Sequence, residues 1–492
     1  MKAAALRERL ERAKLLVRWP PRPSGAPSLE WSAVTTDSRR VVPGTLFCAY
    51  AGSAADGHAF VVAAAKAGAT AALVEKPVPG SWIPLIEVTD GKVAAAAAAA
   101  LFYGDPANSL ELLGVTGTNG KTTTVHLLRH LFSDRGPAGS IGTLGAIDGE
   151  GHILPTAGSL TTPGPVDLQA ALAALRDGGV RVVAMETSSH SLDQGRIAGL
   201  EFLVGIFTNL TRDHLDYHGD VATYLAAKAK LDDYLAPEGF QIVNADDPAW
   251  DGLPRRAQRL TFGIANLSDV MAEGIEGDRS GMRFVLAAHG RSEKVALPLL
   301  GRFNVENALG AAAAAIALGR DLAEVAERLS CAPQVPGRME RISDAPCVVL
   351  RDYAHTPDAL ERALAALRPL TRGRLIVVFG AGGDRDKGKR PLMGAIAARD
   401  ADLAVVTSDN PRTESPERIL DDIEAGMGQT PHLRIVDRRA AIVRAVSIAK
   451  PDDLLFLAGK GHETYQVIGT EHVPMDEREI VASALAASVA SK

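Results

Sequence analysis

The stretch of sequence that decides the fold reads LELLGVTGTNGKTTT, residues 110–124. Its first half, residues 110–116, is an apolar run with the length and composition of a buried strand. Its second half is rich in glycine and threonine and leads into a segment with helical character. Glycine lets backbone N–H groups approach an anion, and a helix N-terminus carries partial positive charge. Strand, turn and helix in this order therefore predict a phosphate-binding loop.

Lys121 and Thr122 supply the side chains that a nucleotide site needs. The lysine can reach the β- and γ-phosphates, and the threonine hydroxyl can bind Mg²⁺. The general P-loop pattern has glycine where this chain has Val115, so the loop is a variant. A turn without a ligand is the alternative, but Gly-Lys-Thr after a strand favours nucleotide binding. The residues expected to contact the nucleotide are Gly117, Thr118, Asn119, Gly120, Lys121, Thr122 and Thr123.

Strands and helices alternate on both sides of this loop. Apolar runs at 180–185 and 203–208 predict further buried strands, and the stretches 165–176 and 221–235 predict helices between them. This alternation predicts a mainly parallel sheet covered on both faces. An alanine-rich helix at 305–318 and a polar helix at 322–329 are expected to close the unit.

Two further units flank the central one. Short β-branched runs and a helical run at 58–67 predict a small α/β domain before the loop. After it, strands expected at 347–351, 374–379, 402–407, 433–436 and 454–458, with helices between them, predict a Rossmann-like doubly wound sheet. Turn-forming residues at 104–109 and 333–337 mark the boundaries. We therefore expect an α/β protein of three domains, at residues 1–107, 108–335 and 336–492.

Composition narrows the class of protein. The chain has 492 residues, of which 46% are hydrophobic and 23% charged, as in a soluble globular protein. Its net charge of -6 argues against a nucleic-acid partner. Residues 1–14 lack the apolar core of a signal peptide, and the longest apolar run, residues 93–103, is too short to span a bilayer. Three widely spaced cysteines indicate a reducing compartment. We expect a cytoplasmic protein without membrane insertion.

Five more motifs follow the glycine-rich loop along the chain. They are METSSH at 185–190, TNLTRDHLDYHG at 208–219, NVEN at 304–307, PGR at 336–338 and DYAHTP at 352–357. With these motifs the chain resembles the Mur ligase family over nearly its whole length, and in particular the members that add diaminopimelate. The resemblance implies an ATP-dependent ligase that joins meso-diaminopimelate to UDP-N-acetylmuramoyl-L-alanyl-D-glutamate through an acyl phosphate, in peptidoglycan precursor synthesis.

The resemblance also implies a metal site that holds two Mg²⁺ ions. Its ligands would be Thr122, Glu186, His214 and Lys228, the lysine as a carbamate. Glu186 and His214 each follow an apolar strand, so both are expected at the carboxyl edge of the sheet beside the loop, where a carboxylate suits Mg²⁺. A hydrogen-bonding histidine and a solvated helix lysine are the alternatives for His214 and Lys228.

Further nucleotide contacts and two catalytic roles rest on the same resemblance. Asn307, Arg338 and Asp352 match residues around the adenine, phosphates and ribose. Arg338 could also stabilise the transferring γ-phosphoryl group. His355 is a candidate for deprotonating the amine. A helix cap is the alternative for Asn307.

Two loops of the first domain resemble those that hold the UDP group. The residues concerned are Thr36, Ser38, Ser53, Ala54 and Ala55. Thr161, Thr162, Ser188, Gln194 and Arg196 match positions that contact the muramoyl peptide, although Leu160 replaces an asparagine often found there. On composition alone the first-domain residues could simply form turns.

The third domain is expected to select the amine. The matching residues are Arg385, Asp409, Asn410, Pro411, Arg412, Gly459 and Glu463. Diaminopimelate has a second carboxylate that lysine lacks, and the Arg412 guanidinium can bind one bidentately, while Arg385 could hold the other. Glu463 suits the distal ammonium. An Asx-Pro turn with a surface arginine is the alternative.

Three rival functions are distinguishable by experiment. A lysine-adding ligase or a folylpolyglutamate synthetase shares the central loop, but the first-domain loops and Arg412 argue against both. A P-loop switch or transporter motor would hydrolyse ATP without an amino acid. A nucleotide-binding scaffold would tolerate loss of Lys121 and Glu186. We expect a monomer with ATP and the two other substrates as its partners.

Overall fold

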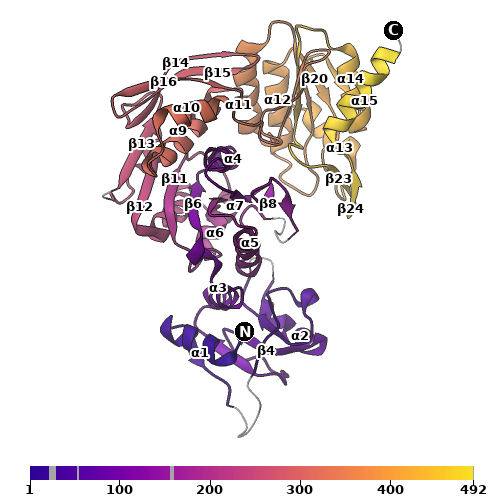
Figure 1. Cartoon of the computed structure of the whole chain (residues 1–492). Helices are drawn as coiled ribbons and strands as arrows, with labels where there is room; N and C mark the ends of the chain where they lie inside the picture. Colours follow the sequence, from indigo (N-terminus) through magenta and orange to yellow (C-terminus); the bar gives the residue numbers. More distant parts are fainter. Residues whose placement is uncertain (22–28, 53–54, 156–159, 257, 491–492) are drawn as a thin grey trace. The chain divides into compact units, whose positions relative to one another are not determined.

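The computed structural model describes residues 1–21, 29–52, 55–155, 160–256 and 258–490 (Figure 1). The chain divides into two compact units, Met1–Met271 with Asn307–Asp321, and Ala272–Glu306 with Leu322–Lys492. It passes from one to the other three times: within strand β14 (Val270–Asp278), within helix α9 (Arg302–Ala317), and between Asp321 and Leu322. None of the helices in the described ranges is long and apolar enough to cross a membrane.

The first unit opens with a five-stranded sheet. Its strands are β1 (Leu16–Arg18), β2 (Ala33–Thr35), β3 (Thr45–Cys48), β4 (Ala69–Val74) and β5 (Leu85–Val88), in the order β1-β5-β4-β3-β2. Only β1 runs antiparallel to its neighbour. Helices α1 (Ala3–Arg12), α2 (Val61–Ala67) and α3 (Gly91–Phe102) accompany it. Five of the seven alanines of α3 are buried, which allows close packing of this helix.

A second sheet in the same unit carries the phosphate loop. The strands of this sheet that lie wholly in the first unit have the order β13-β12-β11-β6-β10-β7-β8-β9, and β14 continues the sheet beyond β13. The strands are β6 (Glu111–Thr116), β7 (Ala138–Gly142), β8 (Gly145–Ile147), β9 (Ile153–Leu154), β10 (Val182–Glu186), β11 (Phe202–Phe207), β12 (Leu235–Asn244) and β13 (Arg259–Gly263). The strands from β13 to β7 pair in parallel, which confirms the predicted parallel sheet. Helices α4 (Lys121–Phe132) and α5 (Pro165–Asp177) lie where helices were expected.

Two expectations for the stretch between 221 and 300 need correction. The helix predicted over 221–235 ends earlier: α8 spans Val221–Ala229, and a 3-10 turn at Lys230–Tyr234 leads into β12. In the second unit, β15 (Gly281–Ala288) and β16 (Arg291–Leu297) form an antiparallel hairpin that the sequence analysis did not predict. Its two-residue turn, His289-Gly290, has positive φ at both positions, as the twist of a hairpin requires.

The second unit contains a six-stranded sheet in the order β17-β18-β22-β19-β20-β21. Its strands are β17 (Glu340–Ser343), β18 (Val348–Asp352), β19 (Leu375–Phe379), β20 (Leu403–Val406), β21 (His432–Arg434) and β22 (Leu454–Ala458). All neighbours pair in parallel except β17. The helices are α10 (Leu322–Ser330), α11 (Pro357–Leu367), α12 (Lys389–Asp400), α13 (Pro416–Glu424), α14 (Arg438–Ile448) and α15 (Glu477–Ala490). The Rossmann-like prediction is confirmed.

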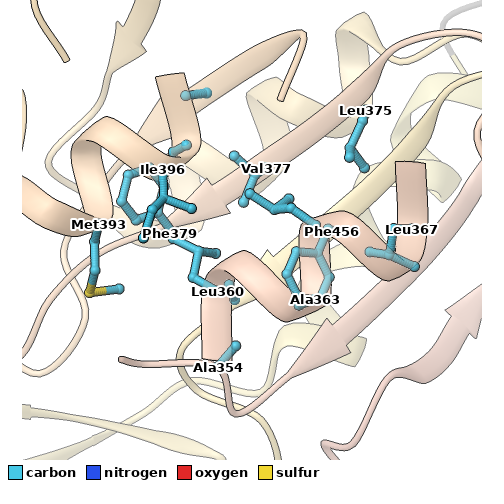
Figure 2. Packing of buried hydrophobic residues seen from close by; sticks show 14 of the residues in the cluster. Ala354, Leu360, Ala363, Leu367, Leu375, Val377, Phe379, Met393, Ile396 and Phe456 are labelled. Carbon is cyan, nitrogen blue, oxygen red and sulfur yellow. The ribbon is translucent and has the colours of Figure 1, made fainter. Parts of the chain in front are cut away.

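The apolar core of this sheet fixes its strand ends. On one face, Leu360 and Leu367 of α11 pack with Val377, Phe379 and Phe456 (Figure 2). On the other face, the buried side chains of α14 and α15 cover the alternate positions of the same strands. Because both faces are covered, the polar loops at the carboxyl ends of the strands are held by a rigid sheet.

Candidate active site

The phosphate loop, residues 117–123, leaves the carboxyl end of β6 and enters α4. Gly117 and Gly120 have φ of 142° and 86°, values that side chains disfavour. A Cβ on Gly117 would lie 1.9 Å from Thr208 Oγ1, and one on Gly120 would lie 2.2 Å from Asn307 Oδ1. Both positions therefore require glycine for conformation and for space. The predicted nucleotide residue Asn307, on α9, thus lies directly against the loop.

The segment after β11 braces the loop. The backbone N–H of Thr118 donates to Asn209 O at 2.7 Å, and that of Asn119 donates to Asn209 Oδ1 at 3.0 Å. The hydroxyl of Thr208 donates to Asn119 O at 2.7 Å, and the backbone N–H of Thr211 donates to Thr118 Oγ1 at 2.9 Å. These contacts explain the polar motif at 208–211, which holds the loop by hydrogen bonds.

Two lysines converge on one carbonyl oxygen of the loop. Lys121 Nζ donates to Gly117 O at 2.9 Å, and Lys228 Nζ donates to the same oxygen at 2.6 Å. Lys228 is only 1% exposed, and its ammonium lies 4.4 Å from the centre of the Tyr224 ring. Burial lowers the pKa of Lys228 well below its usual range, and the nearby Lys121 cation lowers it further. A free ammonium is therefore unfavourable at this position.

Glu186 lies at the end of β10 and is 1% exposed. Its Oε1 accepts a hydrogen bond from Thr143 N at 2.8 Å, and its Oε2 accepts one from Thr143 Oγ1 at 3.2 Å. A Cβ on Gly142 would lie 2.3 Å from Glu186 Oε1, so the carboxylate packs closely on this turn. Thr143, which the sequence analysis missed, thus orients the carboxylate.

His214 precedes the short helix α7 (Leu215–His218) in a left-handed conformation, with φ of 51°. Burial lowers its pKa, although Asp213 opposes the shift. Its ring packs against that of His190 with centroids 4.8 Å apart, and burial lowers the pKa of His190 to about 4. A neutral imidazole with a free lone pair is the form that can act as a ligand.

The residues implied as Mg²⁺ ligands fit the ion in one chemical form. Across the described ranges, no group of three or more His, Cys, Asp or Glu side chains is arranged to hold a metal ion. Mg²⁺ prefers oxygen ligands, and a lysine ammonium offers none. If Lys228 is a carbamate, however, it and Glu186 supply two anionic oxygen groups near the loop. The donor set fits Mg²⁺ with the carbamate and does not fit it with the ammonium.

The residues matched to the muramoyl peptide form one hydrogen-bonded cluster. Thr162 Oγ1 donates to Glu186 O at 2.7 Å and accepts from Ser188 N at 3.1 Å. Arg196 donates to Thr162 O at 3.1 Å and to Gln194 Oε1 at 2.6 Å. Thr161 Oγ1 accepts from the hydroxyl of Thr143 at 3.3 Å. The structure therefore brings all five predicted residues together, next to the carboxylate of Glu186.

The UDP-side residues lie on the first sheet. Thr36 and Ser38 are half-buried after β2, and Asp37 caps the turn by accepting from Arg39 N at 2.9 Å. Ala55 O accepts from Gly52 N at 2.9 Å, which closes the second loop, while the predicted Ser53 and Ala54 lie outside the described residues.

Tyr50 lies near enough to Arg196 for the charge of the guanidinium to act on its hydroxyl. Burial raises the pKa of Tyr50, while a hydrogen bond with Thr36 and the charge of Arg196 oppose the shift. Tyr50 was not predicted as a site residue, because the residues around it in the sequence form no motif that indicates a binding role.

In the second unit, the segments 337–339, 352–354 and 461–462 contact one another at the end of β18. The Asp352 carboxylate accepts from Met339 N at 2.7 Å and from Ala354 N at 2.8 Å. Burial raises the pKa of Asp352, and the charge of Arg338 opposes the rise. A Cβ on Gly337 would lie 2.2 Å from His462 N, so the turn that carries Arg338 packs on the loop after β22. Arg338 itself lies over the Tyr353 ring, 5.1 Å from its centre.

His355 has a defined tautomer in its neutral form. Its Nδ1 lies 2.7 Å from the carbonyl oxygen of Tyr353, which can only accept, so Nδ1 carries the proton and Nε2 has the lone pair. Burial lowers the pKa of His355. Lys389 Nζ donates to the His355 carbonyl at 2.7 Å and fixes the backbone. An imidazole with a free Nε2 is suited to accept a proton.

The loops after β19 and β20 interlock around Arg412. Arg412 Nη1 donates to Gly383 O at 2.8 Å, and Gly383 N donates to Asn410 O at 2.9 Å. A Cβ on Gly383 would lie 1.9 Å from Pro411 O. Arg385, two residues further along, is exposed. The structure thus places the two predicted arginines on adjacent loops.

The remaining amine-side residues form a buried polar cluster. Asn410 Nδ2 donates to Glu463 Oε2 at 3.0 Å, and a Cβ on Gly459 would lie 3.2 Å from Asp409 Oδ2. Asp409 is 6% exposed, and its buried Oδ1 has no hydrogen-bond partner among the described residues. A buried carboxylate oxygen of this kind is suited to a ligand ammonium.

Models of known protein families match most of the chain. The model described as Mur ligase middle domain matches residues 115–315, that of the Mur ligase glutamate ligase domain matches 337–461, and that of the Mur ligase family catalytic domain matches 30–103. The chain therefore belongs to the Mur ligase family of ATP-dependent ligases.

Individual relatives cover almost the whole chain. The UDP-N-acetylmuramoyl-L-alanyl-D-glutamate–2,6-diaminopimelate ligase of Gloeobacter violaceus is 43% identical over 99% of each chain. The protein of the same name from Thermosynechococcus vestitus is 46% identical over 93% of each. A solved structure of a ligase with this name is 34% identical, with a TM-score of 0.68 over 95% of this chain and 98% of that one.

Proposed function

We propose that this chain is a ligase that joins meso-diaminopimelate to UDP-N-acetylmuramoyl-L-alanyl-D-glutamate, with conversion of ATP to ADP and phosphate. The names of relatives at 43% and 46% identity support the substrates. The observation that carries the assignment is the loop at 409–412. Its Arg412 donates to Gly383 O at 2.8 Å, and its Asn410 donates to the carboxylate of Glu463 at 3.0 Å. Cations and anions in this arrangement complement an acceptor with both carboxylates and an ammonium.

The reaction proceeds in two steps. The terminal D-glutamate carboxylate attacks the γ-phosphorus of ATP, which gives an acyl phosphate and ADP. The amine then attacks the acyl carbon, and inorganic phosphate leaves from a tetrahedral intermediate. The first step brings anions together, so the loop N–H groups and Lys121 must offset their repulsion. In the described structure Lys121 Nζ is bound to the Gly117 and Thr118 carbonyls, and it would exchange these contacts for phosphate oxygens.

Glu186, His214, Thr122 and carbamylated Lys228 are the residues that would hold two Mg²⁺ ions. The bound ions would supply positive charge to the phosphate oxygens. Thr143 holds Glu186 in place through both carboxylate oxygens. Burial lowers the pKa of Lys228 and so favours its neutral amine over the ammonium, and the neutral amine is the form that adds to CO₂.

The other residues divide between the two remaining substrate groups. Thr36, Ser38 and the loop at 53–55 would bind the UDP group, and the cluster around Thr162 and Arg196 would bind the muramoyl dipeptide. Asn307, Arg338 and Asp352 would contact the nucleotide. His355 would accept the amine proton at Nε2, because its Nδ1 is bound to the Tyr353 carbonyl. We place the domain boundaries at 107/108 and 335/336.

We further propose that the enzyme works in the cytoplasm as a monomer, where ATP and the nucleotide-linked precursor are available. Phosphate release with ATP, the UDP-linked dipeptide and meso-diaminopimelate tests the proposal. We expect release to require all three. Release with L-lysine at equal efficiency would assign the chain to the lysine-adding type, and release without any amine would indicate a simple ATPase.

A further inference from the structure

Lys460 is a fully buried cation in the loop that follows β22. Its side chain is 0% exposed, and its ammonium lies 2.5 Å from Glu463 Oε2, 2.7 Å from Asn410 Oδ1 and 3.7 Å from Asp409 Oδ1. A buried charge is expensive unless it is paired and hydrogen-bonded, and here all three partners belong to the proposed amine site. The ammonium is therefore bound to residues of this site and is shielded from solvent.

The contacts of Lys460 restrict the Glu463 carboxylate to one orientation. Glu463 Oε2 receives both the lysine ammonium and Asn410 Nδ2, the latter at 3.0 Å. Glu463 Oε1 accepts no hydrogen bond from any described residue. One oxygen is thus anchored while the other remains available to a ligand.

Asn410 is fixed in the same way. Its Oδ1 accepts from Lys460 Nζ at 2.7 Å and from Val467 N at 2.8 Å, so its Nδ2 must face Glu463. Val467 belongs to β23 (Tyr465–Ile468), which forms a hairpin with β24 (Glu471–Pro474). Lys460 and the hairpin therefore hold the Asn410 side chain together.

The same hairpin holds the backbone of Arg412. Arg412 N donates to Val467 O at 3.0 Å, and Arg412 O accepts from Gly469 N at 2.8 Å. Arg412 has φ of 51°, an unfavourable conformation for a residue with a side chain, and these two bonds stabilise it. The segment from Lys460 to Gly469 thus organises both halves of the amine site.

Charge gives Lys460 a second effect. Asp409 and Glu463 both lie within reach of the Lys460 ammonium, which offsets part of their negative charge. The negative charge that remains attracts a ligand ammonium. Without Lys460 the two carboxylates would repel each other.

We propose that Lys460 is a positioning residue that determines amine selectivity, because it orients Glu463 and Asn410 toward the distal ammonium of the acceptor and sets the net charge of their cluster. The proposal rests on the proposed function. Lys460 itself does not touch the reacting atoms.

Substitution Lys460→Met tests the proposal in the full-length enzyme. Loss of charge-assisted hydrogen bonds should raise KM for meso-diaminopimelate about 10- to 100-fold, while KM for ATP and for the UDP-linked dipeptide stays within about twofold. Lys450→Met makes the same chemical change at an exposed lysine of the same unit and should leave all three constants unchanged. An unaltered KM for diaminopimelate in a folded Lys460→Met enzyme would overturn the proposal.

Two readouts separate positioning from a general structural role. With 2-aminopimelate, which has both carboxylates but no distal ammonium, Lys460→Met should change kcat/KM far less than with diaminopimelate. In a Glu463→Gln background, Lys460→Met should add less than about a threefold further loss, because the charge through which it acts is already gone. Equal losses for both acceptors, or additive losses in the double variant, would contradict the proposal.

Stability must be measured in parallel, by thermal unfolding. If Lys460→Met does not fold, Lys460→Gln retains a donor for Asn410 Oδ1 without the charge and should show the same loss with diaminopimelate. If both variants fail to fold while Lys450→Met folds, Lys460 is a structural residue and the proposal is wrong. Failure of the proposed function is distinct, because the unsubstituted enzyme would then release no phosphate in response to diaminopimelate.

Discussion

The ammonium of Lys228 lies 2.6 Å from the carbonyl oxygen of Gly117, the first residue of the phosphate loop. Lys121 donates to the same oxygen at 2.9 Å. Two cations around one acceptor in a buried position are mutually repulsive, and this lowers the pKa of Lys228 beyond the effect of burial. Conversion of Lys228 to a carbamate would make it an anion, which the Lys121 ammonium attracts. The contact therefore links the lysine on α8 to nucleotide and metal binding.

Substitution Lys228→Ala should reduce kcat about 100-fold or more, because it removes the carbamate that would hold a Mg²⁺ ion beside the transferring phosphoryl group. Short carboxylates added to the buffer should restore part of the activity. The matched control is Lys230→Ala, a surface lysine paired with Asp193 at 2.8 Å, which should remain active. Mass spectrometry of the native protein should show an added CO₂ on Lys228. A fully active Lys228→Ala enzyme would contradict this role.

Substitution Gly120→Ala should damage nucleotide binding. Its Cβ would lie 2.2 Å from Asn307 Oδ1 at φ of 86°, so either Asn307 or the loop must move. We expect KM for ATP to rise about tenfold or more. Gly179→Ala is the control, because Gly179 has φ of 80° and nothing within 4 Å of the new Cβ. Because of backbone strain, Gly179→Ala should lower the free energy of unfolding by about 1 kcal/mol, but it should leave KM for ATP unchanged. Equal KM values for the two variants would argue against a steric role of Asn307.

Substitution Arg412→Ala should remove most turnover of meso-diaminopimelate. The loss of a charge-assisted contact with a carboxylate should lower kcat/KM about 10- to 100-fold, and the preference over L-lysine should narrow by the same factor. Arg418→Ala, at an exposed arginine on α13, should behave like the unsubstituted enzyme. If the preference over lysine persists in Arg412→Ala, another residue selects the acceptor.

The three cysteines should differ sharply in reactivity. Burial raises the pKa of Cys48 to about 12 and that of Cys347 to about 11, whereas Cys331 is exposed. A thiol reacts as its thiolate, so a raised pKa suppresses labelling at pH 8 and delays it until the pH approaches the pKa. Native protein at pH 8 should therefore take up maleimide rapidly at Cys331, and unfolded protein at all three. Rapid labelling of Cys48 in the native state would show that the first sheet is not packed as described.

Much of the fold was predictable because its signals are local. The strand β6, the glycine turn and α4 lie in one continuous stretch, and the alternation of apolar runs with helices in the second unit is equally regular. The β15–β16 hairpin was missed, although β15 alternates the buried Met282, Phe284 and Leu286 with more exposed residues. The end of α8 at Ala229 was also missed, since the sequence continues with helix-compatible residues up to β12.

The candidate site was predictable where a motif carries it. The cluster of Thr161, Thr162 and Arg196 comes together as the resemblance implied. Thr143 and Lys460 were not singled out, because their importance lies in contacts with residues that are distant along the chain, such as Glu186 and Asn410. No sequence pattern around a threonine in a turn or a lysine after a strand predicts which distant residues they contact.

The central claim is that ATP is consumed only when an acceptor amine with two carboxylates is present. Inorganic phosphate release should be measured with ATP, Mg²⁺ and UDP-N-acetylmuramoyl-L-alanyl-D-glutamate, first with meso-diaminopimelate, then with L-lysine, then with no amine. The account predicts rapid release with diaminopimelate, much slower release with lysine, and almost none without an amine. Equal release in all three reactions would contradict it.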